Sequence, residues 1–420
     1  MQLNGLFDFI KSSPNAYFAV WNMARAFEAA GYRRLKESEA WELSAGKYYV
    51  TRDDSSLIAF VIPEKEFKGF RIIASHSDSP SFKIKPNPEK KAGGDCVVLN
   101  VEKYGGMILS TWFDRPLSVA GRILLDTEEG VETKLVNIDR DLLMIPSLAI
   151  HMDRAANDGR KIEVQKELLP LYSGDGGKGE SLLSLVAKEA GVAEKDILDT
   201  DLFLYNRQEP TSYGADGEFI AAPRLDDLQC VYASMEGLLA AEPGDMIAMH
   251  AVFNNEEVGS ETKQGAASSF LSDVMERICE KFGAGKEELI RKRAASFMIS
   301  ADNAHACHPN YPEKADPTSR PVLNGGVVIK YNANQRYTTD GVSAAIFRKL
   351  CRKAGVPVQE YVNHSDIAGG STLGSIATTR VSMNTVDVGL PQLAMHSAYE
   401  TAGAEDTAAM IRMAEEFFNE

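Results

Sequence analysis

Cysteine is scarce in this chain of 420 residues, which contains five, an odd number. The five are scattered along the sequence and never form a C-x-x-C pair. This excludes a disulfide framework or a zinc ribbon as the basis of the fold, and it favours reduced thiols in a cytoplasm. The residues are Cys96, Cys230, Cys279, Cys307 and Cys351.

Long apolar runs and an excess of positive charge are absent as well. No segment approaches the roughly 18 apolar residues of a membrane span. The N-terminal stretch, with Asp8 early, has no basic region before an apolar run. A net charge of −15 argues against nucleic-acid and anionic-membrane partners, because both require a basic surface. We therefore expect a soluble cytoplasmic protein with neither kind of partner.

The chain does contain alternating helical and strand patterns, which are typical of α/β architecture. The run FRIIASH at residues 70–76 is nearly all apolar, as in a strand that is buried on both faces. Further strands are predicted at residues 56–63, 246–253 and 294–301. Helices are predicted at residues 16–31, 225–241, 343–355 and 404–418.

The segment between Pro86 and Pro223 has a different character. Turn-rich stretches such as PNPEKKAGGD separate short alternating strands such as GRILLDT, residues 121–127. This pattern indicates an inserted β-rich domain. We predict a discontinuous α/β domain of residues 1–88 and 222–420, interrupted by an inserted domain of residues 89–221.

Histidine and acidic side chains stand at the ends of the predicted α/β elements. Open α/β sheets build their sites at the carboxyl ends of strands, so residues far apart in sequence can converge there. His76 ends one strand, with Asp78 two residues later, and Asp302 follows another. The other candidates are Asp226 and Asp227 at the start of a helix, Glu256 and Glu257 after a strand, and His396.

Each candidate also has an ordinary interpretation. An aspartate that opens a helix is more often an N-cap than a ligand, a histidine at a strand end is usually a hydrogen-bonded group, and a Glu-Glu pair is usually solvated. Together, however, two histidines and at least three carboxylates are the ligand supply of a two-metal hydrolytic site. Imidazole and carboxylate without thiolate suit Zn²⁺, Co²⁺ or Mn²⁺.

The chemistry of such a site suggests roles for these residues. Asp78 is close enough in sequence to orient the ring of His76 through its second nitrogen. Neighbouring side chains at a strand end point in different directions. One of Glu256 and Glu257 can therefore bind metal while the other acts as general base.

Six motifs resemble, in the same order, those of the M18 family of metallo-aminopeptidases, the aspartyl aminopeptidase group. The resemblance extends from about residue 10 to the C-terminus. It implies an α/β metallopeptidase domain interrupted by a β-rich dimerisation domain, and a homo-oligomer that is a tetrahedral dodecamer. The motifs are SHSDSP (75–80), PRLDDL (223–228), NNEEVGSE (254–261), SADNAHACHPNY (300–311), IKYNANQRY (329–337) and QLAMHS (392–397).

The resemblance also implies a role for each matching residue. Glu256 would be the general base and Asp226 the carboxylate that bridges two divalent ions, zinc ahead of cobalt or manganese. Asp78, which orients His76, is counted with Glu256 among the catalytic residues. The remaining metal ligands would be His76, Glu257, Asp302 and His396.

Two further residues match family positions for substrate binding. His151, in LAIHMDR (148–154), resembles a histidine that the family directs into a neighbouring subunit's active site. Its other interpretations are a structural histidine on a strand and a metal ligand. Lys330 matches the family's pocket lysine, which would bind an acidic N-terminal side chain; the ordinary interpretation is a solvated lysine at a strand end.

The loop NHSDIAGGSTLG (363–374) departs from the family pattern. Asp366 stands, but Ala368 and Gly369 occupy positions where the family has Pro and Cys. Because this loop lies near the family's substrate pocket, the resemblance says least about side-chain specificity. The loops of the inserted domain are also short, so the resemblance leaves the exact size of the oligomer open.

The function that the resemblance implies is an exopeptidase that removes N-terminal residues, Asp or Glu by preference, from peptides. Two alternatives stay open: an aminopeptidase of broader or non-acidic specificity, and a two-metal deacylase of small amides. A third alternative is an assembly protein that has lost activity. The presence of Glu256, Glu257 and both histidines argues against it.

Overall fold

The computed structural model describes residues 2–420, which form two compact units. The first unit comprises the chain up to Asp78, Pro210–Met395 and Glu400–Glu420. The second comprises Ser79–Glu209 and the short segment His396–Tyr399. The domain predicted for residues 89–221 overlaps the second unit, and its role in dimerisation stays a prediction.

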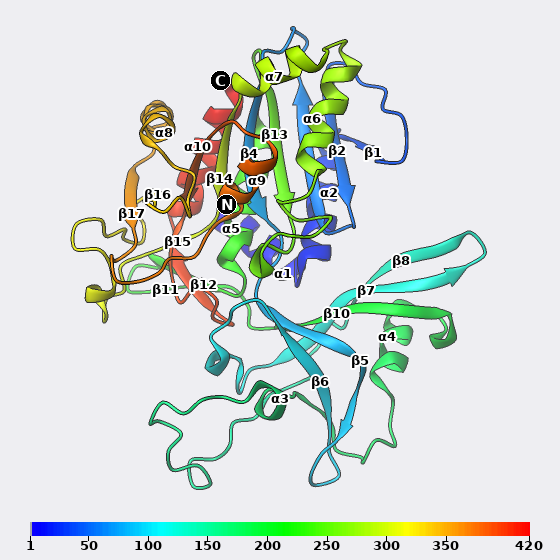
Figure 1. The fold of residues 1–420 in the computed structure, drawn as a ribbon. Helices are drawn as coiled ribbons and strands as arrows, with labels where there is room; N and C mark the ends of the chain where they lie inside the picture. Colours follow the sequence, from blue (N-terminus) through cyan, green and yellow to red (C-terminus); the bar gives the residue numbers. More distant parts are fainter. Residues whose placement is uncertain (1) are drawn as a thin grey trace. The chain divides into compact units, whose positions relative to one another are not determined.

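The first unit is built on a nine-stranded sheet, which runs in the order β1-β2-β3-β13-β4-β14-β18-β16-β17. Strands β13, β4, β14 and β18 are parallel to one another, so their carboxyl ends share one edge of the sheet (Figure 1). The strands are β1 (Arg33–Leu35), β2 (Gly46–Arg52), β3 (Ser56–Ile62), β4 (Phe70–His76), β13 (Ile247–Phe253), β14 (Phe297–Ala301), β16 (Val327–Tyr331), β17 (Val358–Val362) and β18 (Asn384–Gly389).

Helices cover both faces of this sheet, because its central strands are apolar on both sides. Every residue of β3 and of β13 is buried. One face packs against α1 (Gln2–Ser12), α2 (Ala16–Ala29), α5 (Leu225–Ala240), α8 (Gly341–Ala354) and α10 (Asp406–Asn419). The other packs against α6 (Phe270–Lys281), α7 (Lys286–Ala294) and α9 (Leu373–Arg380).

A small five-stranded sheet completes the first unit. Its order is β11-β12-β20-β19-β15. The strands are β11 (Thr211–Tyr213), β12 (Phe219–Ala222), β15 (Ala304–His305), β19 (Pro391–Leu393) and β20 (Glu400–Gly403). In this sheet β19 and β20 pair antiparallel, and the short strand β15 follows directly on the end of β14.

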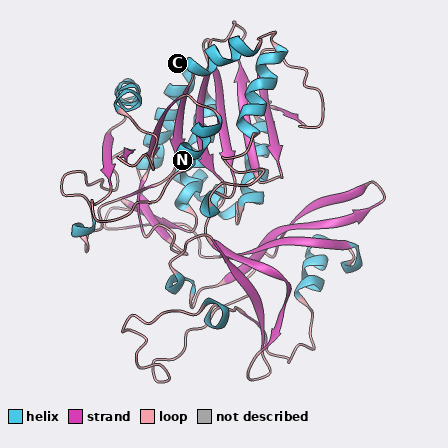
Figure 2. Cartoon of the chain, in the orientation of Figure 1, coloured by secondary structure: helices cyan, strands magenta, loops and turns pink. Residues whose placement is uncertain are grey.

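The second unit is built on a six-stranded antiparallel sheet, shown by its long strands in Figure 2. Its order is β8-β7-β10-β5-β6-β9. The elements are β5 (Ser81–Lys91), β6 (Val97–Tyr104), β7 (Leu117–Thr127), β8 (Gly130–Asn137), α3 (Val164–Glu167), β9 (Leu171–Ser173), α4 (Leu182–Ala190) and β10 (Ile197–Asn206). Its hydrophobic core is separate from the three buried clusters of the first unit.

The predicted α/β class is confirmed, and each predicted helix and strand of the α/β part has a counterpart. The strand predicted from residue 294 begins at Phe297, because Ala294 ends α7. Gly355 caps α8 in the left-handed conformation, whereas α2 is capped by Ala30, with Gly31 following at φ 84°. All five cysteines are free thiols. Within residues 2–420, no helix combines the length and apolar character needed to cross a bilayer.

Candidate active site

His76 and Asp78 lie at the carboxyl end of β4, and both are buried. The Nδ1 atom of His76 lies 3.1 Å from the carbonyl oxygen of Asp78 and 3.5 Å from its Oδ1. The other ring nitrogen, Nε2, lies 3.4 Å from Oδ1 of Asp226. The ring is therefore fixed through Nδ1, which leaves Nε2 directed at a second carboxylate.

Glu256 and Glu257 follow β13, whose last residue, Phe253, pairs with His76 in the parallel register. The chain turns there because Asn255 adopts a left-handed conformation, φ 61°, and starts the short 3₁₀ helix Glu256–Val258. The backbone N–H groups of both glutamates donate to the carboxylate of Asp78, at 3.1 and 3.2 Å. Asp78 thus connects the two glutamates to His76.

Asp226 and Asp227 lie in the first turn of α5 and are buried. Their backbone angles are not helical, the peptide between them is cis, and the N-cap of the helix is Arg224. The helix becomes regular only after this kink, and the N-cap interpretation of the pair stays a prediction. The backbone N–H of His76 donates to Oδ2 of Asp227 at 3.2 Å, so Asp227 supports the end of β4.

Asp302 follows β14, the parallel neighbour of β4 on the other side from β13. Its Oδ1 lies 3.3 Å from Nζ of Lys330, whose side chain is 3% exposed. Nζ also donates to the carbonyl oxygen of Asn303 at 3.1 Å. The interpretation of Lys330 as a solvated lysine is therefore wrong. Gly389 lies against this turn, where any Cβ would overlap the carbonyl oxygen of Asp302.

These strand ends bring potential ligand atoms together in two groups within the first unit. One group is His76, Glu256 and Glu257; the other is His76, Asp226 and Asp302. In each group the ligand atoms all lie within 4.8 Å of one another. Both groups contain His76.

The charges at this site perturb one another. Burial raises the pKa of Glu256 to about 8, and Asp302, Asp78 and Asp226 add to this effect against the opposing influence of His76. Burial also raises the pKa of Asp302, although Lys330 counteracts it. Burial alone would lower the pKa of His76, but the surrounding aspartates raise it well above its ordinary value. Crowded negative charge of this kind is relieved by a bound dication.

His151 and His396 belong to the second unit. His151 lies in an exposed turn, so its interpretation as a structural histidine on a strand is wrong. His396 has a left-handed backbone, φ 64°, and its carbonyl oxygen accepts the N–H of Ile108 at 3.0 Å. The proposed roles of both histidines stay predictions.

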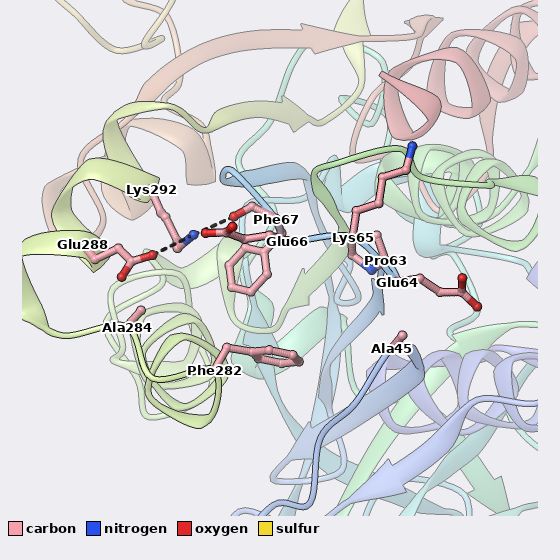
Figure 3. A pocket seen from close by; sticks show the side chains of 10 residues that line it. All are labelled: Ala45, Pro63, Glu64, Lys65, Glu66, Phe67, Phe282, Ala284, Glu288 and Lys292. Atoms are coloured by element: carbon pink, nitrogen blue, oxygen red, sulfur yellow. Dashed lines mark hydrogen bonds and ion pairs between the residues drawn. The ribbon is translucent and has the colours of Figure 1, made fainter.

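A separate hollow of about 250 Å³ lies at the opposite end of β4. It is lined by the loop Pro63–Phe67 and by Phe282 and Lys292 (Figure 3). Nζ of Lys292 donates to the carbonyl oxygen of Phe67 at 2.6 Å and pairs with Glu288 at 3.1 Å. The seven residues of β4 separate this hollow from His76 by about 20 Å. Its lysine is engaged within the protein and contributes nothing to the site at His76.

Three buried polar residues near the site were not predicted from the sequence. They are Asn303, Gln392 and Glu400. Isolated polar residues in apolar surroundings produce no periodicity, so the sequence pattern does not reveal that they are buried. The sequence indicated them only through their position in the SADNAH motif or close to His396.

Comparison with known proteins identifies relatives over the whole chain. The family model described as Aminopeptidase I zinc metalloprotease (M18) matches residues 9–418. A probable M18 family aminopeptidase 2 of Clostridium novyi is 46% identical over 99% of this chain and 98% of its own length.

Solved structures agree with this match. A cryo-EM structure of the Ape4 and Nbr1 complex contains a chain with 38% identity and a TM-score of 0.95, covering 99% of this chain and 85% of that one. The mApe1 dodecamer of S. cerevesiae gives 29% identity and a TM-score of 0.87, covering 99% of this chain and 95% of that one.

Proposed function

Because the chain belongs to the M18 family of zinc metallo-aminopeptidases, we propose that it removes Asp and Glu from peptide N-termini with water activated between two divalent ions. Its membership makes the protein a hydrolase and a zinc-dependent aminopeptidase. The acidic preference, the two-ion mechanism and the residue roles are proposals.

The observation that carries the mechanism is the convergence on Asp78. One carboxylate lies beside Nδ1 of His76 and accepts the N–H groups of Glu256 and Glu257. Asp78 therefore positions three residues: the proposed ligand His76, the proposed base Glu256 and the proposed ligand Glu257. Orientation of a metal-binding histidine through its other nitrogen is the usual arrangement in zinc sites.

The donor set fits zinc, since imidazole and carboxylate oxygens without thiolate are ligands that Zn²⁺ accepts. The residues that would hold the ions are His76, Asp226, Glu257, Asp302 and His396, with Asp226 as the bridging carboxylate. When bound, zinc supplies an acidified water and polarises the scissile carbonyl.

The proton transfers then fall to Glu256. Its carboxylate takes a proton from the water and delivers it to the leaving amine. Burial and acidic neighbours raise the pKa of Glu256 to about 8 when no metal is bound, and bound dications would lower it toward the ionised form that accepts a proton. Asp78 keeps the segment that carries Glu256 in place through the two N–H bonds.

Lys330 supports the acidic preference and also a competing role. A buried ammonium can pair with the carboxylate of a substrate Asp or Glu. Its contact with Asp302 at 3.3 Å, however, favours a role in holding that aspartate, and then specificity would be broader. The altered loop at Ala368 and Gly369 leaves the same alternative open.

A screen of aminopeptidase substrates over N-terminal residue types tests the proposal, with Zn²⁺, Co²⁺ and Mn²⁺ supplied in turn. We expect Asp- and Glu-terminated substrates to be cleaved fastest. Equal rates on Asp, Leu and Ala would disprove the acidic preference alone. Cleavage of N-acyl amino acids in place of free N-termini would support the deacylase alternative.

We further propose a homo-oligomer, up to a tetrahedral dodecamer, in which His151 enters a neighbouring active site. The relative from S. cerevesiae is described as a dodecamer. Around His151 the apolar side chains of Leu148, Ile150 and Met152 are 54%, 46% and 76% exposed. Such exposure is typical of a segment that another chain covers.

A further inference from the structure

A line of buried polar side chains lies beside the candidate site and takes no part in the reaction proposed above. Glu400 is 2% exposed, Gln392 1% and Asn303 2%. Buried polar groups are costly unless their hydrogen bonds are made, and a connected set of them specifies one arrangement. The direction of each bond in this line can be followed from one end to the other.

At one end, Glu400 binds the main chain of Asp226. The backbone N–H of Asp226 donates to Oε2 of Glu400 at 3.0 Å. Asp226 lies in the first turn of α5, where N–H groups have no partner within the helix. The side chain of Glu400 therefore determines where the main chain at Asp226 lies.

The other end reaches the turn that carries Asp302. Nε2 of Gln392 donates to Oε1 of Glu400 at 3.4 Å, and Nδ2 of Asn303 donates to Oε1 of Gln392 at 2.6 Å. Asn303 follows Asp302 directly in the chain. The line therefore connects Asp226 by three hydrogen bonds to Asn303, which is bonded to Asp302 through the main chain.

A backbone carbonyl fixes the direction of every bond in this line. Nδ2 of Asn303 faces the carbonyl oxygen of Leu225 at 3.1 Å, which can only accept. Asn303 must therefore present its amide NH₂ on this side, so Gln392 presents oxygen to Asn303 and NH₂ to residue 400. Residue 400 then has to accept at both terminal atoms, which a carboxylate does and an amide does not.

We propose that Glu400 is a positioning residue for the metal site, which acts with Gln392 and Asn303 to hold Asp226 and Asp302 at ligand distance before metal binds. This inference rests on the proposed function, since it takes both aspartates as metal ligands. An amide at position 400 leaves two donors facing each other somewhere along the line, whichever way the amides turn.

Three variants test the proposal: Glu400→Gln, Gln392→Glu and the double variant with both changes. Glu400→Gln should weaken zinc binding about 10–100-fold, as the loss of partners behind metal ligands does. The double variant restores every bond, because Gln at 400 accepts from Asp226 and donates to Glu at 392, which accepts from Asn303. Its zinc affinity should return to within about threefold of the parent.

The measurement is titration of the metal-free full chain with Zn²⁺ against a chromophoric chelator, with circular dichroism and apo Tm to check folding. The matched control is Asp406→Asn. Asp406 is 1% exposed and accepts the N–H groups of Asn324 and Gly326, at 2.7 and 2.9 Å, and none of these three residues belongs to a ligand group. Asp406→Asn should lower the Tm of the metal-free protein and leave its zinc affinity unchanged.

The outcomes separate the two proposals. A parent protein that fails to bind zinc overturns the proposed function, and this inference with it. A parent that binds while Glu400→Gln binds equally well overturns the inference alone. If Glu400→Gln does not fold, the double variant decides: it must fold and bind zinc, and its failure to do so counts against the positioning role.

Discussion

At the scale of single residues, the site depends on backbone N–H groups as much as on side chains. Asp78 accepts two of them and Asp227 accepts one, from His76. A carboxylate that accepts N–H bonds is held in one orientation. The carboxylates proposed as metal ligands thus lie beside two others, Asp78 and Asp227, that bind main-chain N–H groups.

The first prediction concerns the general base. Glu256→Gln preserves shape but cannot accept a proton, so kcat should fall about 10²–10⁴-fold while zinc stays bound. Steady-state kinetics together with metal analysis of the purified variant make the measurement. Glu261→Gln, an exposed glutamate of the same segment, is the control and should behave as the parent. A variant at Glu256 with near-parental kcat and full metal would show that the base is another group.

A second prediction separates the two roles of Lys330. If the ammonium binds the substrate carboxylate, Lys330→Ala should lower kcat/KM for Asp-terminated substrates far more than for Leu-terminated ones. If the ammonium holds Asp302, Lys330→Ala should lower kcat/KM equally for all substrates, and zinc should bind more weakly. Breaking one partner of a buried ion pair costs about 3–5 kcal/mol, so either effect is large enough to measure. The ratio of kcat/KM for Asp and Leu decides between them.

At the scale of elements, the pairing of β4 with β13 contains a titratable group that the site does not use. His250, in the middle of β13, is fully buried, and its Nε2 lies 3.0 Å from Oγ of Ser75 in β4. Burial lowers the pKa of His250 to about 3. The folded protein therefore holds this ring neutral at pH values where the unfolded chain protonates it.

A third prediction follows for stability against pH. An unfolded histidine takes up a proton below pH about 6.5. The stability contributed by a neutral His250 is thus complete above that value and is lost as pH falls toward 3. At pH 5 the loss should be about 2 kcal/mol. Denaturant unfolding at pH 7 and pH 5 should show a smaller loss in His250→Gln than in the parent. His364→Gln, which alters a half-buried histidine outside the core, should keep the parental loss.

Elements with strong periodicity could be predicted from the sequence, and the reasons are physical. Helix α2 and strands β3, β4 and β13 each have an apolar pattern that is decided locally. The kink at Asp226 and Asp227 was not predictable, because its hydrogen-bond partners are distant in sequence. The N–H of Asp226 donates to Glu400, 174 residues away, and Asp227 accepts the N–H of His76, 151 residues away. Polar edge strands such as β17, VQEYV, show no period of two.

The candidate site could be predicted to the level of residue identity but not of contact. Strand ends indicated His76, Asp302 and the glutamate pair, since parallel strands share an edge. The N–H bonds to Asp78 and the ion pair of Lys330 depend on side-chain directions that the sequence does not encode locally. The line from Asn303 to Glu400 was missed for the same reason.

At the scale of the whole molecule, the family relationship raises the question of how many chains make one active site. The proposed base, Glu256, is in the first unit, whereas His151 is on an exposed turn of the second. If His151 serves a neighbouring chain, a complete site needs two protomers. Activity should then disappear when the protein is diluted or mutated to monomers, even though each monomer keeps its fold.

The last prediction uses two inactive variants, His151→Ala and Glu256→Gln. A site is intact when its own chain supplies Glu256 and its neighbour supplies His151. Random co-assembly of equal amounts should therefore restore about a quarter of the parental kcat. Mass spectrometry of differently tagged chains confirms exchange of subunits. As control, Glu256→Gln is mixed with a chain that carries both His151→Ala and Glu256→Gln. This mixture should stay inactive, because no chain then carries the base. If the two single variants exchange subunits and activity is not restored, His151 does not serve a neighbouring site. It then acts in the site of its own chain or in none.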